Sequence, residues 1–456
     1  MIRAVYSLLM RLAQPLMRAK LRRRAVAEPG YAVAMDERFG LYATATPNPA
    51  PGQALVWVHA VSLGETRAAA ILVKRLREQR PGMRLLLTHG TATGRAEGAA
   101  LVQEGDVQAW QPWDTPGAVE KFLTHFKPRI GILMETEVWP NLAAACRSRQ
   151  IPLVLANARL SEKSYRQALR LAWLARPAYR ALAAVWAQTE ADAARLNNLG
   201  APVAGVLGNL KFDATPNPQQ LEQARAWRRQ LAQPVVLFAS SRDGEEAALL
   251  AILKDSAHPA SAAARAVQWL IVPRHPQRFD DVAAMASAHG FAVSRRSTWG
   301  NGLPIPAAAA ESAPDLAARA TIWLGDSLGE MPVYYGLASV ALLGGSFEPL
   351  GGQNLIEAAA CACPVVMGRH TFNFAEAALL ALEAGAAQRA SGLAEAVQMA
   401  LSLAADATRL QAARTAAQTF TAAHRGATAQ LVQAIEAMLA NPPIPPILQK
   451  PAKDAA

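Results

Sequence analysis

The feature of this sequence that most constrains its fold is a repeated alternation of short apolar runs with longer helical stretches. Runs that suit buried strands fall at Leu55–Val61, Arg84–Thr88, Ile130–Met134, Pro152–Ala156 and Ala184–Ala187. Stretches that suit helices lie between them, for example Glu65–Glu78, Pro116–Phe126 and Ser161–Ala175. Strands that alternate with helices form parallel sheets, so the pattern predicts an α/β fold.

A second series of apolar runs follows a polar, proline-bearing passage at Asp213–Gln219. Its members are Pro234–Ser240, Val267–Val272, Ala320–Leu324, Ser339–Leu343 and Pro364–Met367. We therefore predict two doubly wound, Rossmann-like parallel-sheet domains, residues 29–214 and 215–440, facing an inter-domain cleft where ligands bind. Residues 441–456 read as a Pro-rich tail that we expect to be disordered.

The composition indicates which classes of partner the protein is expected to bind. The chain of 456 residues has 46 basic and 35 acidic side chains, a net charge of +11, which favours acidic partners. Nucleic acid, anionic lipid and phosphorylated small molecules all qualify. The three cysteines (Cys146, Cys361 and Cys363) form neither a disulfide framework nor a zinc pattern, and they fit a reducing cytoplasm. His59, His89, His275 and His370 lack metal-ligand spacing, so we predict no metal and no cofactor.

The first residues of the chain are basic and apolar together. Seven basic residues precede Ala25 without any acid, and leucines, methionines and a valine lie between them. Arg11 and Arg18 interrupt the apolar run that a signal peptide or a membrane span requires. We therefore predict that residues 1–28 form a segment lying on an anionic membrane surface. A plain solvated helix, or one docked on the core, is the alternative.

The stretch from Val340 to Glu357 predicts an anion site. An apolar run, Val340–Leu343, is followed by the glycine pairs 344–345 and 351–352 and by a predicted helix, Asn354–Ala362. Free amides and the positive end of a helix dipole favour phosphate, and Glu357 is placed to take sugar hydroxyls. A tight turn leading into a capped helix is the alternative.

Polar groups follow strands in both halves of the chain. In the first half, Glu65 follows one predicted strand and the pair Glu135 and Glu137 follows another, while Lys211 lies just before the predicted boundary. A carboxylate at a strand end can act as a general base, although a first-turn glutamate often only complements the helix dipole. An acidic helix start and an ordinary surface lysine are the corresponding alternatives for the other positions.

In the second half, three polar groups follow three successive predicted strands. They are Ser240–Glu245, Arg274 with His275, and Gly325–Glu330. Because the carboxyl ends of parallel strands meet at one edge of a sheet, we expect these groups to converge there.

Several of these motifs together resemble one known family, the Kdo (3-deoxy-D-manno-octulosonic acid) transferases of lipid A assembly. The resemblance covers roughly residues 30–390, and its markers are Val58–Glu65, Met134–Asn141, Asn157–Ser161, Gly208–Asp213, Val272–Pro276 and Gly351–Asn354 with Glu357. It implies a fold of the GT-B type and an inverting glycosyltransferase. Such an enzyme transfers Kdo from CMP-Kdo to a lipid A precursor, lipid IVA, in lipopolysaccharide core biosynthesis and releases CMP.

The resemblance also implies roles for individual residues. The family's proton acceptor falls on Glu65, and its transition-state stabilisers fall on Glu135 and Lys211. Its CMP-Kdo contacts fall on Pro273, Arg274, Leu328, Gly329, Glu330, Asn354, Leu355, Ile356 and Glu357. The chain departs from the family pattern at Arg242 and Gln353, where the family has His, and at Leu328, where it has Met.

The resemblance places such an enzyme on the cytoplasmic face of the inner membrane of a Gram-negative bacterium. The expected partners are CMP-Kdo, the lipid A precursor and the anionic membrane surface. Nucleic acid is not expected, because no recognition motif or interleaved aromatic pattern is present. Another GT-B sugar-nucleotide enzyme, such as an epimerase, is the nearer alternative.

Overall fold

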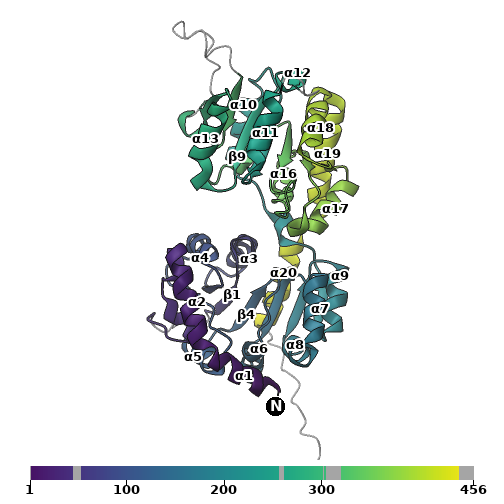
Figure 1. Ribbon diagram of the computed structural model, residues 1–456. Helices are drawn as coiled ribbons and strands as arrows, with labels where there is room; N and C mark the ends of the chain where they lie inside the picture. The colour runs from purple at the N-terminus through teal and green to yellow at the C-terminus, as the bar shows by residue number, and fades with distance from the viewer. Residues whose placement is uncertain (1, 45–52, 256–260, 301, 304–319, 441–456) are drawn as a thin grey trace, which may run out of the picture. The chain divides into compact units, whose positions relative to one another are not determined.

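The computed structural model describes residues 2–44, 53–255, 261–300, 302–303 and 320–440. The predicted α/β fold is confirmed, because the described strands form two seven-stranded sheets whose pairs are all parallel (Figure 1). The chain divides into two compact units. Unit 1 contains the described residues up to Asp213 together with those from Arg425 onward, and unit 2 is Ala214–His424.

The sheet of unit 1 has the strand order β3-β2-β1-β4-β5-β6-β7. Its strands are β1 (Leu55–His59), β2 (Arg84–His89), β3 (Val107–Trp110), β4 (Ile130–Met134), β5 (Leu153–Ala158), β6 (Ala184–Ala187) and β7 (Val203–Val206). The order reverses direction between β1 and β4. In such sheets ligands bind outside the carboxyl ends of the strands at this switch point.

Alternation along the strands gives unit 1 two apolar layers. Val56 and Val58 belong to a core shared with α3 (Leu63–Gln79) and α20 (Ala427–Ala440). Leu55 and Trp57 belong to a core on the other face, which α5 (Pro116–Phe126), α6 (Pro140–Ser148), α8 (Ala172–Tyr179) and α9 (Glu190–Asn198) cover. Every residue of β1 is buried, as expected of a central parallel strand.

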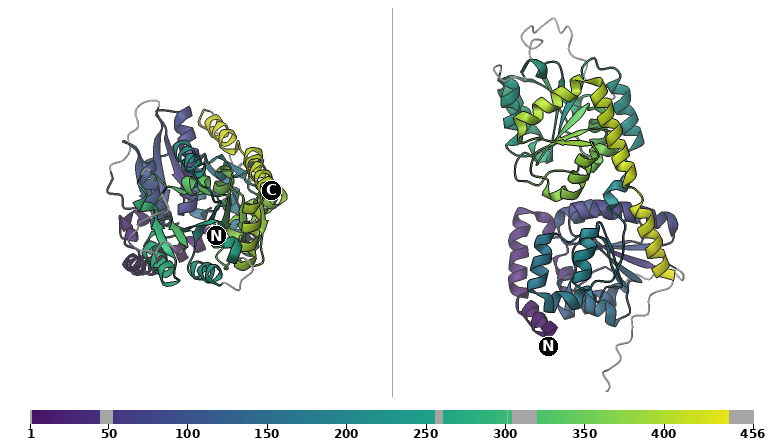
Figure 2. Two further views of the ribbon diagram at one scale, coloured as in Figure 1. Left: turned by 90° about the horizontal axis from the view of Figure 1, so that it is seen from above. Right: turned by 90° about the vertical axis from the view of Figure 1, so that its right-hand side faces the viewer.

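The last described helix departs from the sequence prediction, which assigned residues 215–440 to the second domain. Helix α20 packs with unit 1, where Leu431, Val432 and Ile435 join the core under α3 (Figure 2). The Asp213 carboxylate accepts hydrogen bonds from the amides of Gly426 and Thr428, each at 2.6 Å. Helical periodicity reveals an apolar face but not the core that covers it, and the prediction was wrong for this reason.

The sheet of unit 2 has the strand order β10-β11-β9-β8-β12-β13-β14. Its strands are β8 (Val235–Ser241), β9 (Gln268–Pro273), β10 (Ala292–Arg295), β11 (Thr321–Leu324), β12 (Val340–Leu343), β13 (Val365–Met367) and β14 (Ala387–Arg389). Helices α11 (Glu245–Lys254), α13 (Phe279–Ala288) and α18 (Leu393–Ala405) share one core with these strands. Here the order reverses between β8 and β12, so the carboxyl ends of these two strands define the switch point of unit 2.

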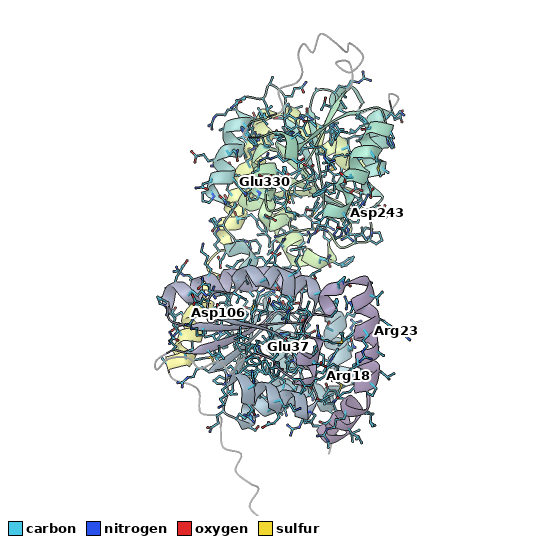
Figure 3. The ribbon with its side chains drawn as sticks, turned by 90° about the vertical axis from the view of Figure 1, so that its left-hand side faces the viewer. Arg18, Arg23, Glu37, Asp106, Asp243 and Glu330 are labelled. Carbon is cyan, nitrogen blue, oxygen red and sulfur yellow. The ribbon has the colours of Figure 1, made fainter. Side chains whose placement is uncertain are left out.

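The N-terminal segment forms two helices, α1 (Ile2–Leu12) and α2 (Gln14–Ala27). Helix α1 docks through polar contacts, because Tyr6 hydrogen-bonds to Asp114 and the Ser7 hydroxyl lies 2.9 Å from Asn141 Oδ1. Its larger apolar side chains point to solvent: Ile2, Val5, Leu8, Leu9 and Leu12 are all exposed, as is Leu16 of α2. Arg18 and Arg23 lie along α2 (Figure 3). Within the described part of the chain, no helix combines the length and apolarity needed to cross a membrane.

Two further predictions need comment. The helix predicted at Ser161–Ala175 is divided at Leu171 into α7 (Glu162–Arg170) and α8, because Leu171 leaves the helical region with φ −112° and ψ 31°. The predicted Pro-rich tail, residues 441–456, lies outside the described residues.

Candidate active site

Glu65 lies in the first turn of α3, directly beyond the carboxyl end of β1. Ser62 is the N-cap of this helix, and its hydroxyl accepts a hydrogen bond from the Glu65 amide at 3.4 Å. In return, the Glu65 carboxylate accepts from the Val61 amide at 2.9 Å and from the Ser62 hydroxyl at 3.2 Å. This reciprocal arrangement is a variant of the capping box, in which the carboxylate accepts from the amide that precedes the N-cap residue. Glu65 therefore stabilises the helix start and also stands at the switch point of the sheet.

The environment of Glu65 shifts its pKa towards neutrality. Burial raises the pKa of Glu65 to about 7, the hydrogen bond from the Val61 amide opposes this shift, and the charges of Glu135 and Glu137 add to it. A carboxylate that titrates near neutral pH can accept a proton efficiently at that pH. The side chain is only partly buried, so the carboxylate is not closed off from a substrate.

Glu135 is the first residue after β4, on the other side of the switch point, and it forms a buried ion pair with Lys211. Lys211 lies in the 3₁₀ turn η4 (Leu210–Asp213), and its Nζ is 2.9 Å from Glu135 Oε1. The Asn157 side-chain amide donates to the same oxygen at 3.4 Å, and Asn157 Oδ1 accepts from the Leu210 amide at 3.1 Å. These contacts join segments that are far apart in the sequence.

The backbone at this ion pair is in an unusual conformation. Glu135 has φ +60° and Asn157 has φ +52°, so both lie in the left-handed region. This region is uncommon for residues other than glycine, and it persists where the surrounding contacts enforce it, often at functional sites. The left-handed backbone and the ion pair therefore hold this part of the unit 1 edge in one arrangement.

Glu137 faces a histidine that the sequence analysis considered only as a possible metal ligand. His59, the last residue of β1, is fully buried, and its Nε2 lies 3.7 Å from Glu137 Oε2. The Trp139 indole donates to the same oxygen at 3.0 Å. Burial alone would raise the pKa of Glu137, but His59, Trp139 and Arg38 outweigh burial and hold the pKa below its usual value. Glu137 is therefore a persistent negative charge beside Glu65.

In unit 2, the predicted groups follow four neighbouring strands. Leu328–Glu330 follow β11, Arg274 follows β9, Arg242 follows β8, and the glycine-rich stretch follows β12. The Arg274 amide donates to the Ser241 carbonyl at 2.9 Å, which ties two of these strand ends together. The expected convergence at one sheet edge is thus confirmed within unit 2.

The residues predicted to bind CMP-Kdo differ in whether their side chains or only their backbone can contact a ligand. Leu328 is 74% exposed, whereas Leu355 and Ile356 are each 1% exposed, so only the backbone of these two can contact a ligand. Asn354 is the N-cap of α16 (Leu355–Ala360) and accepts from the Ile356 amide at 3.2 Å. Glu330 pairs with Arg296, 2.8 Å between Oε1 and Nη2, and accepts from the Ser327 hydroxyl. Pro273 ends β9.

The first glycine pair does not match the predicted anion cradle. The Gly345 amide donates to both carboxylate oxygens of Glu245, at 2.9 and 2.8 Å, and the Phe347 amide donates to the same carboxylate at 3.4 Å. The turn binds an anion, as its geometry indicates, but the anion belongs to the protein. Sequence reasoning missed this role of Glu245 because the two segments are a hundred residues apart.

Across the described residues, no group of three or more His, Cys, Asp and Glu side chains could hold a metal ion.

Comparison with known proteins places these motifs in a family. A family model described as 3-Deoxy-D-manno-octulosonic-acid transferase (kdotransferase) matches residues 34–214. The chain is 47% identical to a 3-deoxy-D-manno-octulosonic acid transferase of Bordetella pertussis over 441 residues, covering 95% of this chain and 99% of the relative. It is 32% identical to the corresponding Haemophilus influenzae protein over 406 residues, covering 88% and 90%.

Solved structures with low sequence identity share the fold. A UDP-GlcNAc 2-epimerase from Neisseria meningitidis, bound to UDP-GlcNAc, is 14% identical and aligns with a TM-score of 0.54 over 84% of this chain and 100% of the epimerase. A glycosyltransferase from Rickettsia africae is 13% identical, with a TM-score of 0.54 over 86% and 100%. The fold is therefore of the GT-B type, and it is common to epimerases and transferases. The sequence relatives decide between these classes: the chain belongs to the 3-deoxy-D-manno-octulosonic acid (Kdo) transferase family of glycosyltransferases.

Proposed function

We propose that this protein transfers Kdo from CMP-Kdo to a lipid A precursor, with inversion at the anomeric carbon. An acceptor hydroxyl oxygen attacks the anomeric carbon, the bond from that carbon to the phosphate oxygen of CMP breaks, and CMP leaves. Glu65 takes the hydroxyl proton. The observation that carries this proposal is the partly exposed Glu65 carboxylate at the switch point of unit 1, where burial raises its pKa to about 7.

Glu135 and Lys211 are the proposed transition-state stabilisers. Their ion pair is mostly withdrawn from solvent, with side-chain exposures of 10% and 18%, so its charges act in a medium of low effective dielectric. Because Asn157 and the η4 turn also hold the pair, little reorganisation is needed when charge develops on the substrate.

The residues of unit 2 are the proposed donor site. CMP is an anion, and Arg274 supplies a cation at the end of β9, beside the turn that follows β8. Pro273, Leu328, Gly329, Glu330 and Asn354–Glu357 contribute side-chain or backbone contacts from the neighbouring strand ends. Arg242 and Gln353 would replace the histidines of the family pattern near this edge.

The reaction is tested by mass spectrometry of the lipid product together with measurement of CMP release. Incubation with CMP-Kdo and lipid IVA is expected to add Kdo mass to the lipid and to release an equal amount of CMP. Without lipid, CMP release should remain at the background level. Release of CMP without acceptor, or an unchanged lipid in the presence of active protein, would contradict transfer.

The proposed location is the cytoplasmic face of the inner membrane, where the lipid acceptor is embedded. The contacts of α1 support this location, because Tyr6 and Ser7 face the protein while the leucines of the helix face outward. Seven basic residues precede Ala25, and each basic residue near an anionic surface contributes about 1 kcal/mol of binding.

Outward-facing substitutions test this surface better than truncation. Tyr6 contacts Asp114, and Ser7 contacts Asn141 at the start of α6. Because Asn141 lies only a few residues after Glu137, deleting the N-terminal segment would also disturb the loop that carries Glu137. We expect Leu9→Gln/Leu12→Gln to reduce flotation with anionic vesicles and to lower turnover on acceptor in vesicles more than on acceptor in detergent. The control Leu379→Gln, at an exposed position of unit 2, should change neither. Equal flotation of the Leu9→Gln/Leu12→Gln variant and this control would place membrane binding elsewhere.

A further inference from the structure

The buried carboxylate of Glu245 joins the two loops at the switch point of unit 2. Glu245 is the first residue of α11, and it is only 2% exposed. One of its oxygens also accepts from the Arg242 amide at 2.9 Å, in addition to the bonds from the amides of Gly345 and Phe347. Backbone amides from the loop after β8 and from the loop after β12 therefore share one carboxylate.

These bonds fix the start of the loop that leads to Asn354. The Gly345 carbonyl accepts from the Gly352 amide at 2.7 Å, which closes the loop on itself two residues before Asn354. At the far side, the Asn373 side chain donates to the Leu350 carbonyl at 3.1 Å, and the Asn373 amide donates to the Gly351 carbonyl at 3.0 Å. The loop is thus held at its start by Glu245 and near its end by Asn373.

The loop after β12 approaches the end of β8 so closely that no side chain fits between them. A Cβ atom on Gly344 would lie 2.3 Å from the Ser240 carbonyl oxygen, which is far inside contact distance. The Gly345 amide is buried with Glu245, and the amides of Arg242 and Phe347 are partly buried. A buried amide that loses its acceptor destabilises the folded state. The carboxylate therefore does more for this turn than a neutral side chain of the same size could do.

We infer that Glu245 is a positioning residue, which sets the loop from Gly344 to Gly352 so that Asn354–Glu357 are presented to the donor. This inference rests on the proposed function for the identity of the donor, but not for the state of the loop. It also gives the first glycine pair a role different from direct phosphate binding. If the amides of Gly345 and Phe347 bound the donor phosphate, Glu245 would have to leave them whenever CMP binds.

Hydrogen exchange of the wild-type protein separates these two roles. We expect the amides of Gly345 and Phe347 to exchange slowly without any ligand, and adding CMP should change their exchange little. Fast exchange without CMP that becomes slow in its presence would overturn the inference, because the amides would then serve the ligand. This measurement does not depend on the stability of any variant.

Glu245→Gln tests the consequence for the donor. The Gln side chain keeps one acceptor but turns an N–H donor towards the Arg242 or Gly345 amide, so the loop should loosen. We expect CMP affinity, measured by calorimetry, to fall by about tenfold and KM for CMP-Kdo to rise similarly, with KM for the lipid acceptor unchanged. Wild-type CMP affinity in a folded Glu245→Gln variant would overturn the inference, as would equal losses for donor and acceptor.

Asp243→Asn is the matched control, because Asp243 lies in the same turn at the surface of unit 2 (Figure 3). Its side chain is 92% exposed and pairs with Arg278 rather than with the loop. It should bind CMP as the wild type does. If the wild type binds no CMP and transfers no Kdo, the proposed function fails, while the exchange measurement still decides whether Glu245 holds the loop.

Discussion

Each unit has a glutamate at the same position of its fold. The two carboxylates differ in how much hydrogen-bond acceptor capacity remains for a substrate and in how exposed they are. Glu65 follows β1 and Glu245 follows β8, and each of these strands borders the switch point of its sheet. Burial raises the pKa of both. Glu65 accepts one backbone amide and one hydroxyl and remains partly exposed, whereas Glu245 accepts three backbone amides and is 2% exposed. A shifted pKa therefore does not by itself identify a base; free acceptor capacity and access are also needed.

The surroundings of the two carboxylates differ in the same way. Near Glu65 are two further acids, Glu135 and Glu137, and a strained backbone. Near Glu245 are glycine turns and the arginines 242 and 274. The edge of unit 1 thus favours proton transfer, and the edge of unit 2 favours binding of an anion.

The strongest test of this contrast is Glu65→Gln. We expect turnover to fall by about hundredfold or more, because the proposed proton acceptor is lost. Gln can also occupy this third helical position, so the thermal unfolding temperature should change little at pH 4, where the Glu65 carboxyl is protonated. Steady-state kinetics and calorimetry measure the two quantities. A folded variant with near-normal turnover would remove Glu65 from the role of base.

A double substitution at the Glu135–Lys211 pair separates catalysis from stability. Lys211→Met alone leaves a buried carboxylate without its cation, which should cost about 3–5 kcal/mol of stability and lower turnover by tens of fold. Glu135→Gln/Lys211→Met should recover much of the stability, measured by chemical denaturation, but not the turnover. If the double variant recovers both, the pair has only a structural role.

Arg274→Ala should have a smaller effect, confined to the donor. Loss of one charge-assisted contact to phosphate is expected to raise KM for CMP-Kdo by about tenfold, with KM for the acceptor nearly unchanged. Arg265→Ala, on an exposed arginine of the same unit, is the control. A larger effect on the acceptor than on the donor would reverse the roles that we assign to the two units.

The smallest expected effect is a shift in the pH dependence of kcat/KM. The proposed base, Glu65, must be deprotonated, so kcat/KM should rise tenfold per pH unit below its pKa of about 7 and level off above it. Glu137→Gln removes a charge that contributes less than burial does, so this limb should move to lower pH by only a fraction of a unit. A pH profile of the wild type without this limb would contradict the assignment.

The same shift has a consequence for stability. Because folding raises the pKa of Glu65, its ionisation opposes folding as pH rises from its unfolded value towards 7. Glu65→Gln should therefore be more stable, relative to the wild type, at pH 8 than at pH 4.

The sequence predicted the ten interior strands of the two sheets and missed four, β3, β7, β10 and β14, each of which is an edge strand. Interior parallel strands are covered on both faces, so they read as continuous apolar runs. The edge strands are less buried and carry polar residues or glycine, for example Gln108 in β3, Gly205 in β7 and Arg389 in β14. Their pairing is decided by the neighbouring strand rather than by their own pattern.

The motifs of the candidate site could also be found from the sequence, because each follows a strand and the carboxyl ends of parallel strands share an edge. The partners within the site could not be found in this way. Lys211 reaches Glu135 across 76 positions, and His59 faces Glu137 across 78.

The sequence by itself therefore determined the class of fold, the edge at which chemistry is expected and the residue types available there, because these depend on local periodicity and on chain order. Only the tertiary structure decided that α20 returns to unit 1, that α1 turns its leucines outward and that Glu245 occupies the glycine turn. Each of these depends on which distant surface satisfies an apolar face, a buried carboxylate or a set of amides. The local sequence indicates that such a group requires a partner, but the packing of the whole chain determines which residue the partner is.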